Sequence, residues 1–126
     1  MIHLDTQVVV WLAAKRQNQL SRRALKEIER SNDLRISPIV LVEIEVLIEI
    51  RRIKAHSALG LLEVLADDLD VKLSSASLES VARMACSFAW TRDPSDRLIV
   101  ANAMADNARL VTADGTIRAN FKDAVW

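Results

Sequence analysis

The sequence has few of the residues that build disulfide-stapled, zinc-bound or flexible proteins. Of its 126 residues, only one is cysteine, two are glycine and two are proline. A single cysteine permits no internal disulfide, and with two histidines it supplies too few ligands for a structural zinc cluster. So few glycines and prolines leave no flexible linker or low-complexity segment. The lack of disulfides fits a reducing compartment, and we expect the protein to be cytoplasmic.

An excess of charge of one sign and long apolar runs are also missing. Basic and acidic residues number 17 each, so the net charge neither demands nor excludes a nucleic-acid partner. No apolar run approaches the ~18 residues that span a bilayer, and the N-terminus lacks the basic leader of a signal peptide. We therefore expect no membrane partner. The remaining composition, 51% hydrophobic and 27% charged, predicts one globular domain over residues 1–126.

Short apolar runs alternate with longer helical patterns, which predicts an α/β fold with a short, mostly parallel sheet. The expected strands are Met1–Leu4, Leu34–Ser37, Val71–Leu73, Arg109–Thr112 and a short fifth one at Ala124–Val125. The expected helices are Thr6–Ala14, Ser21–Arg30, Pro38–Ile53, Ala55–Ala66, Ser75–Ala89 and a last one from Asp93-Pro94 to Asp106. Two of these helices begin with a capping residue followed by proline, a strong start signal.

Two carboxylates lie on helix faces that are otherwise apolar. Glu43 shares its face with Val40 and Val46, and Asp96 shares its face with Ile99. A bare carboxylate on such a face is costly unless something compensates its charge. For Glu43, either a bound cation or a buried arginine would do so. For Asp96, a capping role at the start of its helix is the alternative.

Two further carboxylates follow apolar strands directly. Asp5 comes after the first expected strand, and Asp114 comes after the fourth. In an open parallel sheet, ligand sites form beyond the carboxyl ends of the strands, so these two acids can converge there. Taken singly, Asp5 could be a helix cap and Asp114-Gly115 could be a turn.

Four clustered carboxylates without histidine or cysteine would make a hard, oxygen-rich site. Such a site suits Mg²⁺ or Mn²⁺ better than zinc. The cluster is electrostatically unfavourable when it binds nothing, so cation binding is expected. Acidic magnesium sites mostly perform phosphoryl transfer or phosphodiester hydrolysis, in which the metal activates a water molecule and neutralises the leaving oxygen.

Four stretches of the chain carry a resemblance to a known family. They are LDTQVVVWL at Leu4–Leu12, ISPIVLVEIEVLIEIRRI at Ile36–Ile53, RDPSDRLIVANA at Arg92–Ala103 and LVTAD at Leu110–Asp114. In this order and at these spacings, the chain resembles the PIN-domain ribonucleases, and more closely the VapC-type toxins of bacterial toxin–antitoxin pairs. The resemblance covers essentially the whole chain. It implies a single PIN domain with a three-layer α/β/α sandwich.

The resemblance also implies an activity and its residues. PIN-domain toxins are Mg²⁺-dependent endoribonucleases, in which Mn²⁺ can substitute, and they leave a 3′-hydroxyl and a 5′-phosphate. Matched by motif, the catalytic acids are Asp5, Glu43, Asp96 and Asp114, and the metal ligands among them are Asp5, Asp96 and Asp114. Thr6 and Thr112 would support these acids by hydrogen bonds. Asp93 could bind a second metal, with helix capping as its alternative role.

The implied partners are an RNA substrate, a cognate antitoxin protein and a second copy of the chain in a homodimer. The apolar helix Pro38–Ile53 could meet one of the two protein partners. Basic residues gather at Lys15, Arg16, Arg22 and Arg23 and again at Arg51, Arg52 and Lys54, where they either follow RNA or form a solvated face. The alternative to the nuclease is a catalytically silent PIN-fold module that binds RNA or protein.

Overall fold

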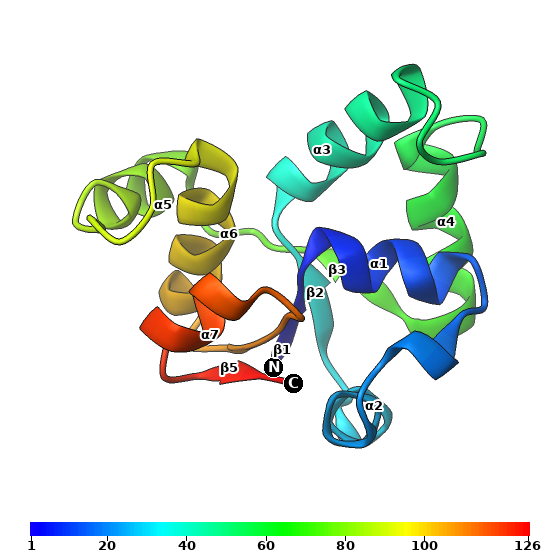
Figure 1. Ribbon diagram of the computed structural model, residues 1–126, viewed down its shortest axis with the longest axis horizontal. Helices are drawn as coiled ribbons and strands as arrows, with labels where there is room; N and C mark the ends of the chain where they lie inside the picture. Colours follow the sequence, from blue (N-terminus) through cyan, green and yellow to red (C-terminus); the bar gives the residue numbers. More distant parts are fainter.

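The computed structural model describes residues 1–126 and shows a five-stranded sheet between two groups of helices (Figure 1). The strands are β1 (Ile2–Leu4), β2 (Leu34–Ile36), β3 (Val71–Leu73), β4 (Arg109–Val111) and β5 (Ala124–Val125). Their order across the sheet is β3-β2-β1-β4-β5, and every neighbouring pair is parallel. The predicted α/β fold with a short parallel sheet is confirmed, and β1 is its central strand.

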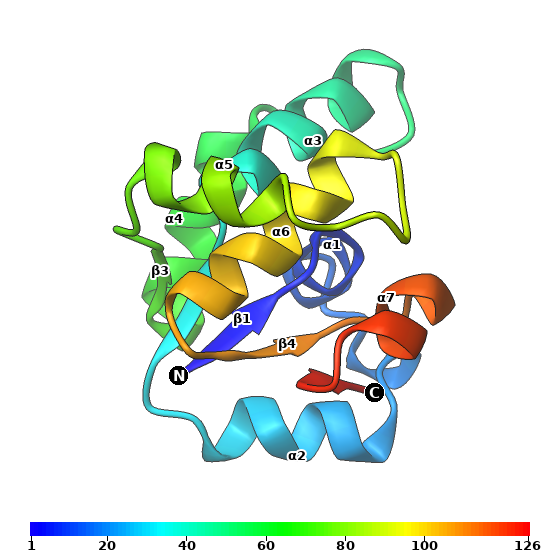
Figure 2. The same ribbon diagram turned by 90° about the vertical axis from the view of Figure 1, so that its left-hand side faces the viewer.

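The helices cover both faces of this sheet. They are α1 (Thr6–Ala13), α2 (Arg22–Arg30), α3 (Pro38–Glu49), α4 (Ala58–Leu69), α5 (Leu78–Ala85), α6 (Pro94–Ala105) and α7 (Gly115–Asn120), with a 3₁₀ turn η1 (Gln17–Gln19). Helices α1, α3 and α4 gather on one side, and α5, α6 and α7 gather on the other (Figure 1). Figure 2 shows α6 and α2 on opposite sides of β1 and β4. None of the helices combines the length and apolar character needed to cross a bilayer.

The core forms where the strands meet the helices. Leu4, Ile36 and Leu110 of the three middle strands are fully buried, as are Ile99 and Val100 of α6. Parallel strands that helices cover on both faces read as continuous apolar runs, which explains the short runs in the sequence. Burying each such side chain stabilises the fold by roughly 1.5–3 kcal/mol. This packing aligns the strands so that their carboxyl ends open at one common edge.

The helix predicted from Pro38 ends at Glu49 and not at Ile53. The cause is Arg51, whose φ of 60° lies in the left-handed region. The backbone N–H groups of Arg51 and Arg52 donate back to carbonyls of the last helical turn, which closes a Schellman cap. The chain therefore leaves the helix one turn earlier than the apolar pattern predicts.

Two other predicted helices have different bounds. The helix expected over Ala55–Ala66 is shifted towards the C-terminus as α4, because the Ser57 hydroxyl accepts the N–H of Gly60 at 3.0 Å and caps its start. The helix expected over Ser75–Ala89 is shortened to α5, which Ser77 caps. In both cases a serine inside the expected helix or next to it marks the true start.

The sequence did not predict α7. The pair Asp114-Gly115 has the composition of a turn, but it begins a helix instead. The Asp114 carboxylate accepts the N–H of Ile117 at 2.8 Å and caps this helix. The segment that follows β4 therefore has a defined direction where a flexible turn was expected.

A buried polar cluster ties the central strand to α6. His3 of β1 is fully buried, and its Nε2 lies 2.7 Å from Oδ2 of Asp106, the residue that follows α6. The Ser74 hydroxyl donates to the same carboxylate oxygen at 2.7 Å, and the Asn102 amide donates to Ser74 Oγ at 2.7 Å. No sequence pattern around His3 indicates this role, and the structure places His3 at the centre of the network.

Candidate functional site

Asp5 lies where the central strand β1 passes into α1. Its carboxylate accepts the Thr6 N–H at 2.8 Å and the Thr112 hydroxyl at 2.5 Å. Asp5 is buried, and burial raises its pKa above the usual value against the lowering effect of the two hydrogen bonds. Asp5 is thus the helix cap that the sequence allowed, and it also faces the edge of the sheet.

Glu43 approaches the same edge from α3. It is half-buried, and the Thr6 hydroxyl donates to its carboxylate. Burial, reinforced by the negative charge of Asp5, raises the pKa of Glu43. None of the protein's ion pairs involves Glu43, so a buried arginine does not compensate it.

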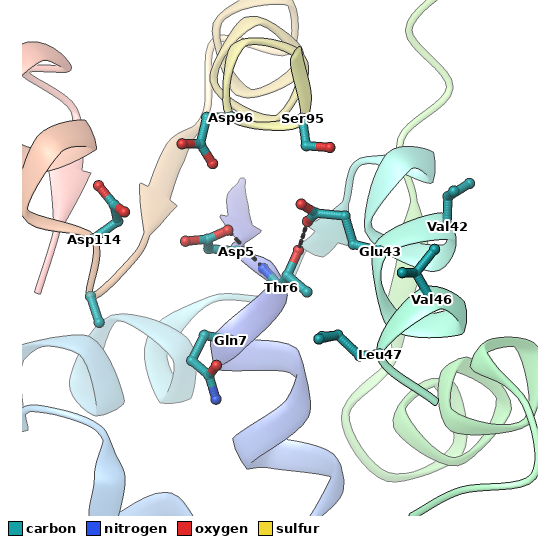
Figure 3. Close-up of a pocket in the computed structure, with 11 residues that line it drawn as sticks. Asp5, Thr6, Gln7, Val42, Glu43, Val46, Leu47, Ser95, Asp96 and Asp114 are labelled. Atoms are coloured by element: carbon teal, nitrogen blue, oxygen red, sulfur yellow. Dashed lines mark hydrogen bonds between the residues drawn. The ribbon is translucent and has the colours of Figure 1, made fainter. Parts of the chain in front are cut away.

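Asp93 and Asp96 share the start of α6 but have different surroundings. The exposed Asp93 is the N-cap, and its carboxylate accepts the N–H groups of Ser95 at 2.8 Å and Asp96 at 3.3 Å. Asp96 does not cap its own helix and points into the space above β1 (Figure 3). Burial and the nearby charges of Asp93, Asp114, Asp5 and Glu43 raise the pKa of Asp96 to about 6.

Asp114 follows β4 and is held through Thr112. The Thr112 hydroxyl donates to Asp5 and accepts the Asp114 N–H at 3.0 Å. This buried hydroxyl therefore connects the two acids that leave the neighbouring strands β1 and β4. Thr6 and Thr112, both expected as supporting residues, each donate a hydroxyl hydrogen bond to the carboxylate of one of the four acids.

A Thr112→Val substitution tests this connection, because valine keeps the shape of threonine and lacks the hydroxyl. We expect RNA cleavage to fall by about 10- to 100-fold, since Asp5 loses the bond that orients it. Cleavage assays and thermal melts of the variant check this, with the exposed Thr116→Val as the matched control. Wild-type cleavage in a folded Thr112→Val protein would contradict the orienting role.

All four predicted acids line one cavity of about 630 Å³. Figure 3 shows Asp5, Asp96 and Asp114 around one space, with Glu43 entering from the side of α3. The remaining lining residues are Thr6, Gln7, Val42, Val46, Leu47, Ser95 and Ala113. The structure therefore brings the four acids together, whereas Asp93 stays outside the cavity.

The apolar part of the cavity wall does not follow from the sequence pattern. Val46, which helical spacing places on the face of Glu43, is 47% exposed, and the neighbouring Val42 is 57% exposed. Val40, on the same predicted face as Glu43, is fully buried, and so is Ile44. Because both sides of this helix are apolar, the sequence pattern could not show which apolar residues face the cavity and which face the core.

The oxygen ligands that line the cavity are of the kind that a hard divalent cation prefers. Carboxylate oxygens predominate, threonine and serine hydroxyls lie beside them, and no lysine or arginine lines the cavity. As placed, no three carboxylates stand close enough together to ligate a single ion. Since neighbouring carboxylates repel one another, a cation at this edge requires some of these side chains to turn inward.

Comparison with known proteins agrees with this architecture. The PIN domain family model matches residues 2–121. The chain belongs to the PIN-domain family. Over 118 residues it is 34% identical to Ribonuclease VapC22 of Mycobacterium tuberculosis, a match that covers 93% of this chain and 89% of that protein. The resemblance to VapC-type PIN domains is therefore confirmed.

Solved structures share the fold of this PIN domain. One is a toxin-antitoxin complex from Klebsiella pneumoniae, with a TM-score of 0.66 and 16% identity over all of this chain and 97% of that chain. Another is VapBC2 from Rickettsia felis bound to a DNA fragment from its promoter, with a TM-score of 0.60 and 22% identity over 99% and 96% of the two chains. At these identities the likeness establishes the three-layer PIN fold.

Proposed function

We propose that this PIN domain is a metal-dependent endoribonuclease that acts as the toxin of a toxin–antitoxin pair. The observation that carries the proposal is the cavity at the carboxyl edge of the sheet, which acids from four separate segments line. The name of its relative VapC22 and the toxin–antitoxin complexes that share its fold support the same function. The substrate is RNA, and hydrolysis of its phosphodiester bonds leaves a 3′-hydroxyl and a 5′-phosphate.

The roles of the acids follow from their surroundings. Asp5, Asp96 and Asp114 would hold Mg²⁺ or Mn²⁺, which supplies activation of the attacking water and neutralises charge on the leaving oxygen. Glu43 faces the cavity, and its raised pKa suits a group that accepts a proton from that water. Thr6 and Thr112 orient Glu43 and Asp5 by their hydroxyl hydrogen bonds.

The proposed protein partners fit the apolar surface of α3. Val42, Val46 and Ile50 are 57%, 47% and 57% exposed, more apolar surface than one helix of a monomer usually presents. A cognate antitoxin or a second copy of the chain in a homodimer would cover these side chains. With these partners and an RNA substrate, the cytoplasm is the compartment in which we propose that the protein acts.

Metal dependence is the first test of the proposal. We expect the purified protein to cut RNA in a total-RNA pool when Mg²⁺ or Mn²⁺ is present, to stop in EDTA, and to resume when the metal is restored. Mapping the cut ends would identify the target. An Asp5→Asn variant purified in parallel controls for contaminating ribonuclease.

Two results would contradict the proposal of a metal-dependent nuclease. Cleavage that persists in EDTA would remove the metal from the mechanism. Cation binding detected by calorimetry without cleavage of any RNA would favour the silent PIN-fold binding module.

A further inference from the structure

A groove continues from the acidic cavity along α1. Gln7 and Leu47 line both that cavity and a second hollow of about 270 Å³. The second hollow in turn shares most of its wall with a third hollow of about 280 Å³, which reaches the connection between α3 and α4. The shared residues are Val10, Ala14, Arg16, Arg52 and Ile53. The three hollows therefore form one path from the acids to this connection.

The far part of this path is basic. Arg16 and Arg52 line both outer hollows, and Lys54 lines the last one. We call this part, defined by these three residues, the basic groove. All three side chains are exposed, and none takes part in an ion pair or a side-chain hydrogen bond. By contrast, the neighbouring Lys15 pairs with Asp68.

The backbone of Arg16 and of Arg52 is fixed by hydrogen bonds to the preceding helix. The Arg16 N–H donates to the Trp11 carbonyl at 2.8 Å, and the Arg52 N–H donates to the Leu47 carbonyl at 2.8 Å. Each bond belongs to a Schellman cap, in which the preceding residue, Lys15 or Arg51, is left-handed with a φ of 57° or 60°. The ends of α1 and α3 thus present one arginine each to the same hollow.

Helix capping alone does not account for these arginines. Cations near helix C-termini interact favourably with the helix dipole, which is the alternative explanation for the positions of these arginines. Yet the guanidinium groups that donate hydrogen bonds within the protein are those of Arg35, Arg83, Arg97 and Arg109, so the donors of the two groove arginines stay available. Like charges that gather without an acid are best satisfied by an anionic ligand.

We propose that the basic groove binds the backbone phosphates of the RNA strand on one side of the bond that is cut. The inference rests on the proposed ribonuclease function, because it is the continuity with the acidic cavity that selects RNA over other polyanions. At ~1.5 Å rise per residue, the C-terminal end of α1 lies about 9 Å beyond Gln7, within reach of a phosphate near the cleaved one. Val10, Trp11 and Ile53 give the groove an apolar wall against which a base can lie.

The test measures RNA binding separately from cleavage. Fluorescence anisotropy of a labelled single-stranded oligouridylate is recorded in EDTA over a range of salt concentrations. We expect Arg16→Gln and Arg52→Gln each to weaken binding by about threefold to tenfold at low salt and to lower the slope of log Kd against log salt by ~0.7. Arg16→Lys and Arg52→Lys should restore most of the slope, because a lysine still neutralises a phosphate.

Arg30→Gln is the matched control, since Arg30 is an exposed, unpaired arginine at the end of α2 and lines none of these three hollows. Thermal melts establish that each variant is folded. The proposal is overturned if wild-type protein does not bind the oligonucleotide, or if the groove variants bind as Arg30→Gln does. It is also overturned if poly-glutamate binds more tightly than RNA with the same dependence on Arg16 and Arg52, which would make the groove a site for an acidic polypeptide.

The experiments distinguish a wrong assignment of the basic groove from a wrong assignment of ribonuclease function. Metal-dependent cleavage by the wild-type protein tests the nuclease and does not depend on the groove. If wild type cleaves RNA while Arg16→Gln and Arg52→Gln leave KM unchanged, the nuclease stands and the groove assignment is wrong. We expect a raised KM with a nearly unchanged kcat, because the groove holds substrate and transition state alike.

Discussion

Replacing Asp96 with asparagine is expected to abolish metal-dependent RNA cleavage and, in the same protein, to raise the melting temperature without metal. The pKa of Asp96 is raised to about 6 by burial and by the charges of four neighbouring acids. At pH 7 the folded protein therefore holds an ionised group in surroundings that favour its neutral form. Asparagine removes that charge and keeps the shape, but it is a much poorer ligand for a hard cation.

The sign of the pH dependence follows from the direction of this shift. Because the pKa of Asp96 is higher in the folded state than in the unfolded state, the folded state binds the proton more tightly. The stability that this proton contributes is present below pH 4 and is lost as the pH rises through about 6. The stabilisation by Asp96→Asn should therefore be largest near pH 7 and vanish towards pH 4.

We expect Asp96→Asn to have a moderate effect on stability and a large effect on activity. After discounting for partial exposure, the shift corresponds to about 1–2 kcal/mol, or a rise in Tm of about 3–8 °C. Calorimetry at pH 7 and pH 4.5 measures it, and RNA cleavage is assayed at pH 7. Asp67→Asn, at an exposed position without an ion pair, is the control. An unchanged or lower Tm would mean that Asp96 is not destabilised by its neighbours, and retained cleavage would remove it from the catalytic group.

Three of the four acids have positions that local rules fix, which is why those positions could be predicted. Asp5 and Asp114 follow apolar strands, and parallel strands end at one edge of a sheet. Asp96 is placed by the capping residue and proline that begin α6. The chemistry at the edge thus depends on short stretches of sequence, and tertiary packing only has to bring those stretches together.

The wall of the cavity and the ends of the helices could not be predicted in the same way. An apolar pattern on α3 does not say which apolar face is covered, and Val42 and Val46 prove to be exposed. Helix ends are usually marked by glycine, but this chain has only two glycines. The left-handed positions after α1, α3, α4 and α6 are taken by Lys15, Arg51, Asp70 and Asn107. Arg51 and Asp70 are not usual stop signals, so the predicted ends of α3 and α4 were wrong, whereas the predicted ends of α1 and α6 lie within one residue of the observed ones.

The buried histidine cluster should give the largest change in stability. Asp106→Ala is expected to lower the free energy of unfolding by about 2–4 kcal/mol, because His3 Nε2 and the Ser74 hydroxyl both lose their common acceptor inside the protein. His3 Nδ1 already lacks a partner, so the variant would leave the whole imidazole unsatisfied. Urea unfolding measures the loss, with Asp123→Ala as the control, since Asp123 is exposed and its side chain makes no bond.

The cluster also predicts how this loss depends on pH. Burial lowers the pKa of His3, and the hydrogen bond and charge of Asp106 only partly offset that effect. A histidine whose pKa is lowered in the folded state loses stability as the pH falls below its unfolded value of 6.5, because the unfolded chain takes up the proton first. Without Asp106 the folded pKa of His3 falls further, so the gap between wild type and Asp106→Ala should widen as the pH falls through the folded pKa of His3 in the wild-type protein. Comparing the two proteins at each pH cancels the opposite contribution of the acidic cavity, which both contain. A small loss that stays constant as the pH falls below 6.5 would show that His3 does not depend on Asp106.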